Sequence, residues 1–174
     1  MSSVALPQLY SSLSGFVRQT LADRCETRVA NLLWMMYGIF LSRSVQLNHI
    51  ARKMPSRAKK LSTVKRFSRF LDNAAVRPRM WYDPFARWML YSASNGGKVH
   101  LIMDSTRIAF GFRLVMVSIA YRRRSLPLIW MWERGTRGHS TGRSQIALLQ
   151  ATKDWLPSPV AVSVVGDCEF GRCS

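Results

Sequence analysis

Two hydrophobic patterns, one before and one after residues 92–97, divide this chain into two regions. Over residues 8–40 and 44–72, apolar side chains recur three or four positions apart, which predicts amphipathic helices. The sequence Ser-Ala-Ser-Asn-Gly-Gly at 92–97 is typical of a turn or linker. Beyond it the apolar residues form continuous runs, which are typical of buried strands. The pattern predicts an α+β fold with a helical region at 1–95 and a second domain at 96–174.

The second region is predicted to contain three strands, a helix and a fourth strand. The segment between the second and third strands is short and basic, so these strands are expected to form an antiparallel hairpin. The helix between the third and fourth strands forms a crossover connection, which allows a parallel pair of strands. The expected strands are residues 98–104, 112–121, 126–132 and 160–166, and the helix is expected to end before Pro157.

Two short helices separated by a tight break predict a helix-turn-helix in the first region. Ser44 is expected to cap the first helix and Ser62 the second, with Pro55 breaking the chain between them. The motif places its second helix in a DNA groove. The inward positions of that helix are expected to be Val64, Phe67, Phe70 and Leu71.

Basic side chains concentrate on and just before this second helix. Six occur among residues 57–69, and that segment contains no acidic residue. The alternative is an ordinary amphipathic helix with a solvated basic face, but the density of one sign of charge favours contact with DNA. The candidate DNA-binding residues here are Arg57, Lys59, Lys60, Lys65, Arg66 and Arg69.

The whole chain is strongly basic, with 26 Lys and Arg against 9 Asp and Glu and a net charge of +17. This excess favours a polyanionic partner, and nucleic acid is expected ahead of an anionic membrane surface. The longest uncharged apolar stretch, residues 29–42, has 14 residues, whereas a membrane span needs about 20. The N-terminus lacks the pattern of a signal peptide, so the three cysteines are expected to be reduced thiols in a cytosol.

Two aspartates, Asp104 and Asp167, directly follow the apolar runs of the first and fourth predicted strands. The order of elements is expected to bring the two carboxylates side by side at one edge of the sheet. Their oxygens are hard ligands that suit Mg²⁺ or Mn²⁺, and such ions assist phosphoryl transfer. A single aspartate after a strand is more often a cap or turn residue, but two in this order favour a metal site. Both are therefore candidate catalytic and metal-binding residues.

The second region resembles the RNase H-like catalytic core of insertion-sequence transposases of the DDE type. The specific parts of the resemblance are Asp104-Ser105-Thr106 and the segment Gly-Asp-Cys-Glu-Phe-Gly at 166–171. The resemblance extends back to about residue 40, because the two short helices are similar to the DNA-binding region of such proteins. Weaker matches are residues 118–121, 126–128 and 137–140.

The resemblance implies a bacterial cytosolic, nucleoid-associated enzyme that binds terminal inverted repeats, nicks DNA with water and joins the 3′-hydroxyl to target DNA. It implies Mg²⁺ or Mn²⁺ at Asp104 and Asp167, with a glutamate on a later helix as the third acidic ligand. The chain stops seven residues after Asp167, and Glu169 is interpreted as a support for the turn. The third ligand is therefore expected to be absent, which leaves an incomplete β-β-β-α-β core that is inactive alone.

Three interpretations of such a chain stay open. It is a transposase fragment that pairs with a C-terminal portion or with itself, a non-catalytic DNA-binding regulator of transposition, or a basic RNA-binding protein. A fourth strand without its cover predicts a marginally stable chain that tends to associate. The basic residues expected to line a DNA path beside the metal site are Arg122, Arg123, Arg124, Arg134, Arg137 and Arg143.

Overall fold

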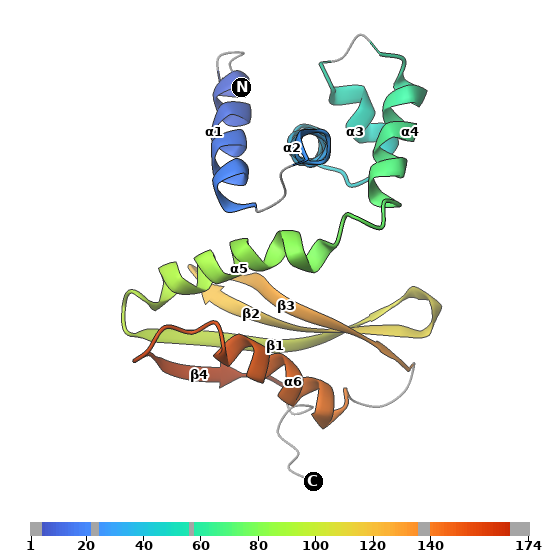
Figure 1. The fold of residues 1–174 in the computed structure, drawn as a ribbon. Coiled ribbons are helices and arrows are strands. Elements are labelled where there is room, and N and C mark those ends of the chain that lie inside the picture. The colour runs from blue at the N-terminus through green and yellow to red at the C-terminus, as the bar shows by residue number, and fades with distance from the viewer. Residues whose placement is uncertain (1–4, 22–24, 56–57, 136–139, 168–174) are drawn as a thin grey trace. The chain divides into compact units, whose positions relative to one another are not determined.

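A computed structural model describes residues 5–21, 25–55, 58–135 and 140–167 (Figure 1). Over these residues the chain has the predicted α+β fold, with six α-helices and a four-stranded mixed sheet. The chain divides into two units, Met1–Trp81 and Tyr82–Ser174.

The division between the units lies inside helix α5 (Pro78–Ser94) rather than at the glycine-rich segment near residue 96. Trp81 stays with the first unit, where its ring lies 5.7 Å from that of Phe70. Ala86 and Leu90 are fully buried in the core of the second unit. Most of α5 therefore belongs with the sheet, because its buried side chains pack there.

The first unit is built from four helices around a common core. Helix α2 packs against α1, α3 and α4. Each helix contributes a fully buried side chain, namely Val17, Leu33, Ile50 and Phe67 in chain order. The helices are α1 (Ala5–Thr20), α2 (Glu26–Ser42), α3 (Leu47–Lys53) and α4 (Lys60–Leu71).

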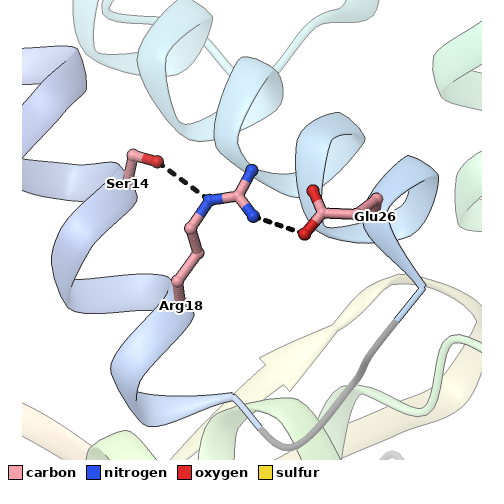
Figure 2. A network of polar contacts seen from close by, with 3 residues as sticks. All are labelled: Ser14, Arg18 and Glu26. Carbon is pink, nitrogen blue, oxygen red and sulfur yellow. Dashed lines mark hydrogen bonds and ion pairs between the residues drawn. The ribbon is translucent and has the colours of Figure 1, made fainter.

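Polar and aromatic contacts join α1 to α2. The ring of Tyr10 stacks on Trp34 with centroids 4.6 Å apart. Arg18 donates hydrogen bonds to Ser14 and to Glu26, with 2.5 Å between its guanidinium nitrogen and the Glu26 carboxylate (Figure 2). The hydrogen bond from Arg18, followed by its positive charge, lowers the pKa of Glu26. The pair is exposed to solvent, so it contributes little to stability.

Close contact between α2 and α3 depends on Gly38. A Cβ atom at this position would lie 2.5 Å from Cγ2 of Ile50, which is itself fully buried. Only a residue without a side chain allows the two helices to approach this closely at this point.

The helix caps expected at Ser44 and Ser62 are wrong. Helix α3 begins at Leu47, and the Ser44 hydroxyl instead accepts a hydrogen bond from the backbone N–H of Gln46. Helix α4 begins at Lys60, two residues before Ser62. The prediction that Leu71 faces inward is also wrong, since 54% of its surface is exposed at the end of α4.

The second unit has its elements in the predicted order (Figure 1). After α5 the chain forms two hairpins, then a helix, then a last strand. The elements are β1 (Lys98–Ile108), the short 3₁₀ helix η1 (Ala109–Gly111), β2 (Phe112–Tyr121), β3 (Arg124–Arg134), α6 (Gly142–Lys153) and β4 (Ala161–Val165).

The sheet has the strand order β3-β2-β1-β4. Strands β2 and β3 are antiparallel, as the short link between them predicts, and β1 is antiparallel to β2. Strand β4 is parallel to β1. A parallel partner requires a crossover, and α6 lies in the segment that supplies it.

One face of the sheet carries the core of the second unit. Val99, Leu101 and Met103 alternate along β1 and are almost fully buried. They belong to one apolar cluster with Ala86 of α5 and Leu148 of α6. The other face is much less covered: His100 and Asp104 are exposed and Ile102 is only partly buried. A solvent-accessible site in this unit is therefore expected on the face of the sheet opposite the core.

Candidate metal and nucleic-acid sites

Asp104 lies within β1 and not at its end, which corrects the predicted strand limit. The strand continues for four more residues because it pairs with β2 as far as Ile108 opposite Phe112. Asp104 stands opposite Met116 of β2 in this ladder. Alternation puts its side chain on the exposed face, away from the core cluster.

Asp167 follows β4 after one glycine, and the register of β4 against β1 determines its level. His100 pairs with Ser163, and their side chains hydrogen-bond to each other across the two strands. Ile102 pairs with Val165 two residues later. Two residues further on in each segment lie Asp104 and Asp167. The β1–β4 ladder ends at Ile102 and Val165, so both aspartates lie just beyond the paired residues, at the same end of the ladder.

The surroundings of both aspartates are open. Asp104 and Asp167 are exposed to solvent. One carboxylate oxygen of Asp104 accepts a hydrogen bond of 2.7 Å from the backbone N–H of Ser105, which restrains the carboxylate next to the strand. This hydrogen bond does not involve the other oxygen of the Asp104 carboxylate.

Asp104 and Asp167 carry carboxylates, the ligand type that a hard divalent ion prefers. In proteins Mg²⁺ usually keeps several waters and binds one or two carboxylates together with substrate phosphates. Asp104 and Asp167 supply two such carboxylates. Over the part of the chain that the structure describes, no group of three or more His, Cys, Asp or Glu side chains is placed to hold a metal. Glu169 lies outside the described residues.

The predicted basic residues around α4 that the structure describes are all exposed. Arg57 lies outside the described residues. Lys59 is the N-cap residue of α4 and Lys60 begins it. Lys65, Arg66 and Arg69 follow on one face of the same helix, because residues three and four apart lie side by side.

These last three residues line a cavity between α2 and α4, with a volume of about 380 Å³. Helix α2 contributes Thr27, Arg28 and Asn31 to the same cavity. The sequence pattern did not single these residues out, since only the packing of the two helices brings Arg28 beside the basic face of α4. The remaining lining residues are Ser62, Phe70 and Asn73.

The predicted basic turn between β2 and β3 has an unusual backbone. Arg122 and Arg123 both have positive φ angles, 43° and 65°. Two consecutive positive φ values define the type I′ hairpin turn, which favours Asn-Gly. Arginines in these conformations are strained, and all of Arg122, Arg123 and Arg124 are exposed. The turn places three positive charges at the tip of the β2–β3 hairpin.

The other predicted arginines do not form one group with this turn in the described residues. Arg134 ends β3, and its guanidinium carbon lies 5.8 Å from the centroid of the Phe112 ring. Arg143 lies in the first turn of α6. Arg137 lies outside the described residues.

The tip of the β1–β2 hairpin carries an aromatic ring that the sequence pattern did not mark. Phe110 is 96% exposed and has a φ angle of 64°. Single exposed apolar side chains are common on protein surfaces, so this ring by itself indicates no partner.

Comparisons of this chain with models of protein families, with curated proteins and with solved structures found no match. Among the described helices, none combines the length and the apolar character that crossing a membrane requires.

Proposed function

We propose that this chain is a DNA-binding protein of the transposase type, with Asp104 and Asp167 as ligands of Mg²⁺ or Mn²⁺ at a phosphodiester. The observation that carries the proposal is the parallel register of β1 and β4, which runs toward the two aspartates from a side-chain contact four residues earlier. The resemblance of the 104–106 and 166–171 segments to insertion-sequence transposases supports the same assignment.

The two carboxylates hold the ion at an exposed position, where a bulky polyanion has access. The ion, when bound, activates an oxygen nucleophile and neutralises charge on the phosphate. The hydrogen bond from Ser105 keeps the Asp104 carboxylate in place. The incompletely covered face around Asp104 leaves room for a duplex.

The basic residues bind the backbone of terminal-repeat and target DNA. Lys59, Lys60 and the face of α4 that carries Lys65, Arg66 and Arg69 form the principal contact in the first unit. Arg122, Arg123 and Arg124 make a second contact in the other unit. These contacts release counterions and depend on salt, as expected for a chain of net charge +17.

The test combines metal binding, nicking and DNA binding in one set of proteins. Supercoiled plasmid is incubated with the chain and Mg²⁺ or Mn²⁺, and binding of a fluorescent 30-base-pair duplex is measured in parallel. Asp104→Asn is expected to weaken Mn²⁺ binding, followed by electron paramagnetic resonance, and to abolish any nicking. Asp154→Asn is the matched control, because Asp154 is an exposed aspartate at the end of α6.

Each outcome supports a different interpretation of this chain. Nicking that Asp104→Asn abolishes and Asp154→Asn leaves intact supports an active metal enzyme. DNA binding with no nicking supports the non-catalytic regulator of transposition. Equal Mn²⁺ affinity in both variants would show that Asp104 does not bind the metal. Tighter binding of RNA than of duplex DNA would show that the partner is RNA.

A further inference from the structure

The tip of the β1–β2 hairpin carries a side chain that the fold does not need. Phe110 is 96% exposed, so its ring adds almost nothing to the core of the second unit. Its backbone lies in the left-handed region, with φ 64° and ψ 26°, which is rare for a bulky residue and favours glycine or asparagine. An exposed ring on a strained backbone is a local conflict between sequence and fold, and such conflicts concentrate at functional sites.

Two exposed arginines border this tip. Arg107 lies near the end of β1, and Arg134 ends β3, where it pairs with Phe112 of β2. Among the described residues, neither arginine forms an ion pair with a carboxylate. Glu133, next to Arg134 in the chain, instead accepts a hydrogen bond from the Thr141 hydroxyl. The tip therefore combines an exposed ring with two unneutralised positive charges.

The register of the strands places one arginine on each face of the sheet. Phe112 pairs with both Ile108 and Arg134, so these three residues share a face. Arg107 is one residue before Ile108 on β1, and alternation puts it on the opposite face. The ring of Phe110 thus follows a ribbon with a cation on either side, which suits a ligand that has negative charge on both sides of an apolar stack.

We propose that the β1–β2 hairpin inserts Phe110 between stacked base pairs of duplex DNA, with Arg107 and Arg134 on the phosphates at either side. The proposal rests on the DNA-binding part of the proposed function and requires no metal. An apolar side chain that enters a groove partly unstacks a base step and kinks the duplex. Because the ring is exposed in the free chain, insertion removes its surface from water without breaking contacts within the fold.

The hairpin is continuous with the strand that carries Asp104 and forms one end of the sheet (Figure 1). Strand β1 extends from Ile102, its last residue paired with β4, to Ile108. Ile108 lies ~13 Å beyond Asp104 at the usual rise of a strand. That length corresponds to ~4 base pairs of a duplex that runs beside the strand. A kink at the tip therefore falls within a few base pairs of the phosphodiester at the proposed metal site.

The experiment follows unstacking with 2-aminopurine, whose fluorescence rises when the base leaves the stack. A 30-base-pair duplex carries this base at its TA steps, which unstack most easily. The wild-type chain is expected to raise the fluorescence. Phe110→Gly is expected to abolish the rise and to weaken binding roughly fivefold or more. The salt dependence of binding is expected to stay unchanged in this variant, because no charge is removed.

Further variants separate the ring from the charges and from folding. Glycine suits the backbone of residue 110, so Phe110→Gly is expected to fold, which thermal unfolding checks. Tyr91→Ala removes another exposed ring, from α5, and is expected to leave the rise intact. Phe110→Trp keeps an aromatic ring and is expected to keep the rise. Arg107→Gln and Arg134→Gln are each expected to lower the salt slope by about 1.

The outcomes distinguish this proposal from the proposed function. Duplex binding without a rise, or a rise that persists in Phe110→Gly, would overturn the insertion and leave DNA binding in place. Tighter binding of a single strand that depended on Phe110 would overturn it in favour of stacking on unpaired bases. Binding to phosphatidylserine vesicles that depended on Phe110, without a rise on the duplex, would overturn it in favour of a membrane surface. If the wild-type chain bound no duplex, the proposed function would itself fail.

Discussion

Gly38 is the residue at which the packing of the first unit is tightest. Replacing it by alanine puts a methyl group 2.5 Å from Cγ2 of fully buried Ile50, so the packing around Ile50 must shift. We expect Gly38→Ala to lower the free energy of unfolding by about 1–3 kcal/mol, the usual range for overpacking. Urea unfolding followed by circular dichroism measures this change.

Gly15→Ala is the matched control for that substitution. Gly15 also lies inside a helix, but a Cβ atom there meets nothing within 4 Å. Alanine is the better helix former, so this variant is expected to gain about 0.5–1 kcal/mol. A loss of stability in both variants would contradict the assignment of the Gly38 effect to the contact with Ile50.

The sequence could predict the chemical type of the candidate site residues but not all of their neighbours. Asp104 and Asp167 were identifiable because each directly follows an apolar run. The position of Arg28 in the α2–α4 cavity was not identifiable, because it depends on packing between segments about 40 residues apart in the chain. A local sequence pattern does not reveal contacts between segments so far apart in the chain.

At the scale of the element, the β2–β3 turn combines strain with charge. Asn-Gly adopts the two positive φ angles of Arg122 and Arg123 with less strain. The double variant Arg122→Asn/Arg123→Gly is expected to stabilise the second unit by about 1–2 kcal/mol and to weaken DNA binding. Unfolding and duplex-binding curves measured on the same preparation check both effects. A stabilised variant with unchanged DNA affinity would show that the turn does not contact the duplex.

The titratable side chain of Tyr82 joins helix α5 to the sheet. The hydroxyl of Tyr82 donates a hydrogen bond to the carbonyl oxygen of Pro127, and burial raises the pKa of Tyr82. A raised pKa in the folded state means that the stabilisation is complete below the unfolded value, about 10, and is lost as the pH rises through the folded value. Urea unfolding between pH 8 and 11.5 should show this additional loss in the wild type and not in Tyr82→Phe. Parallel curves for the two proteins would contradict it.

The strands were more predictable than the helix starts. Strand β2 has the predicted limits, because its apolar run is bounded on both sides. Strand β1 extends past its prediction, since its last residues, Ser105 to Ile108, lie in a hairpin arm where pairing with β2 replaces burial. The caps at Ser44 and Ser62 failed because the serines were judged by residue type, whereas the helix starts were decided by packing of the apolar positions.

At the scale of the whole molecule, we predict that the β4 edge of the sheet promotes self-association. Strand β4 is the edge strand next to β1, and Val162, Val164 and Val165 are 41%, 49% and 58% exposed. Exposed apolar edge strands pair with other chains, and a lysine at the edge opposes this. We expect Val164→Lys to reduce self-association with increasing concentration, as measured by sedimentation velocity.

Ile146→Lys is the control for that experiment. Ile146 is also an exposed apolar residue, 57% accessible, but it lies on α6 and not on a strand. The same charge is therefore added away from the edge. If both variants reduced association equally, repulsion between chains would explain the result and the edge of β4 would not.

During folding, β1 is expected to pair with its two neighbouring strands at different times. Strand β2 joins through a short hairpin, whereas β4 pairs with residues 63 positions earlier in the chain, as in Lys98 opposite Ala161. Distant contacts form late because closing a longer loop loses more entropy. Pulse-labelling hydrogen exchange should therefore find the β1–β2 amides protected before those of β4. During that interval β1 lacks its parallel neighbour, and the nascent chain is then most open to pairing with a strand of another molecule.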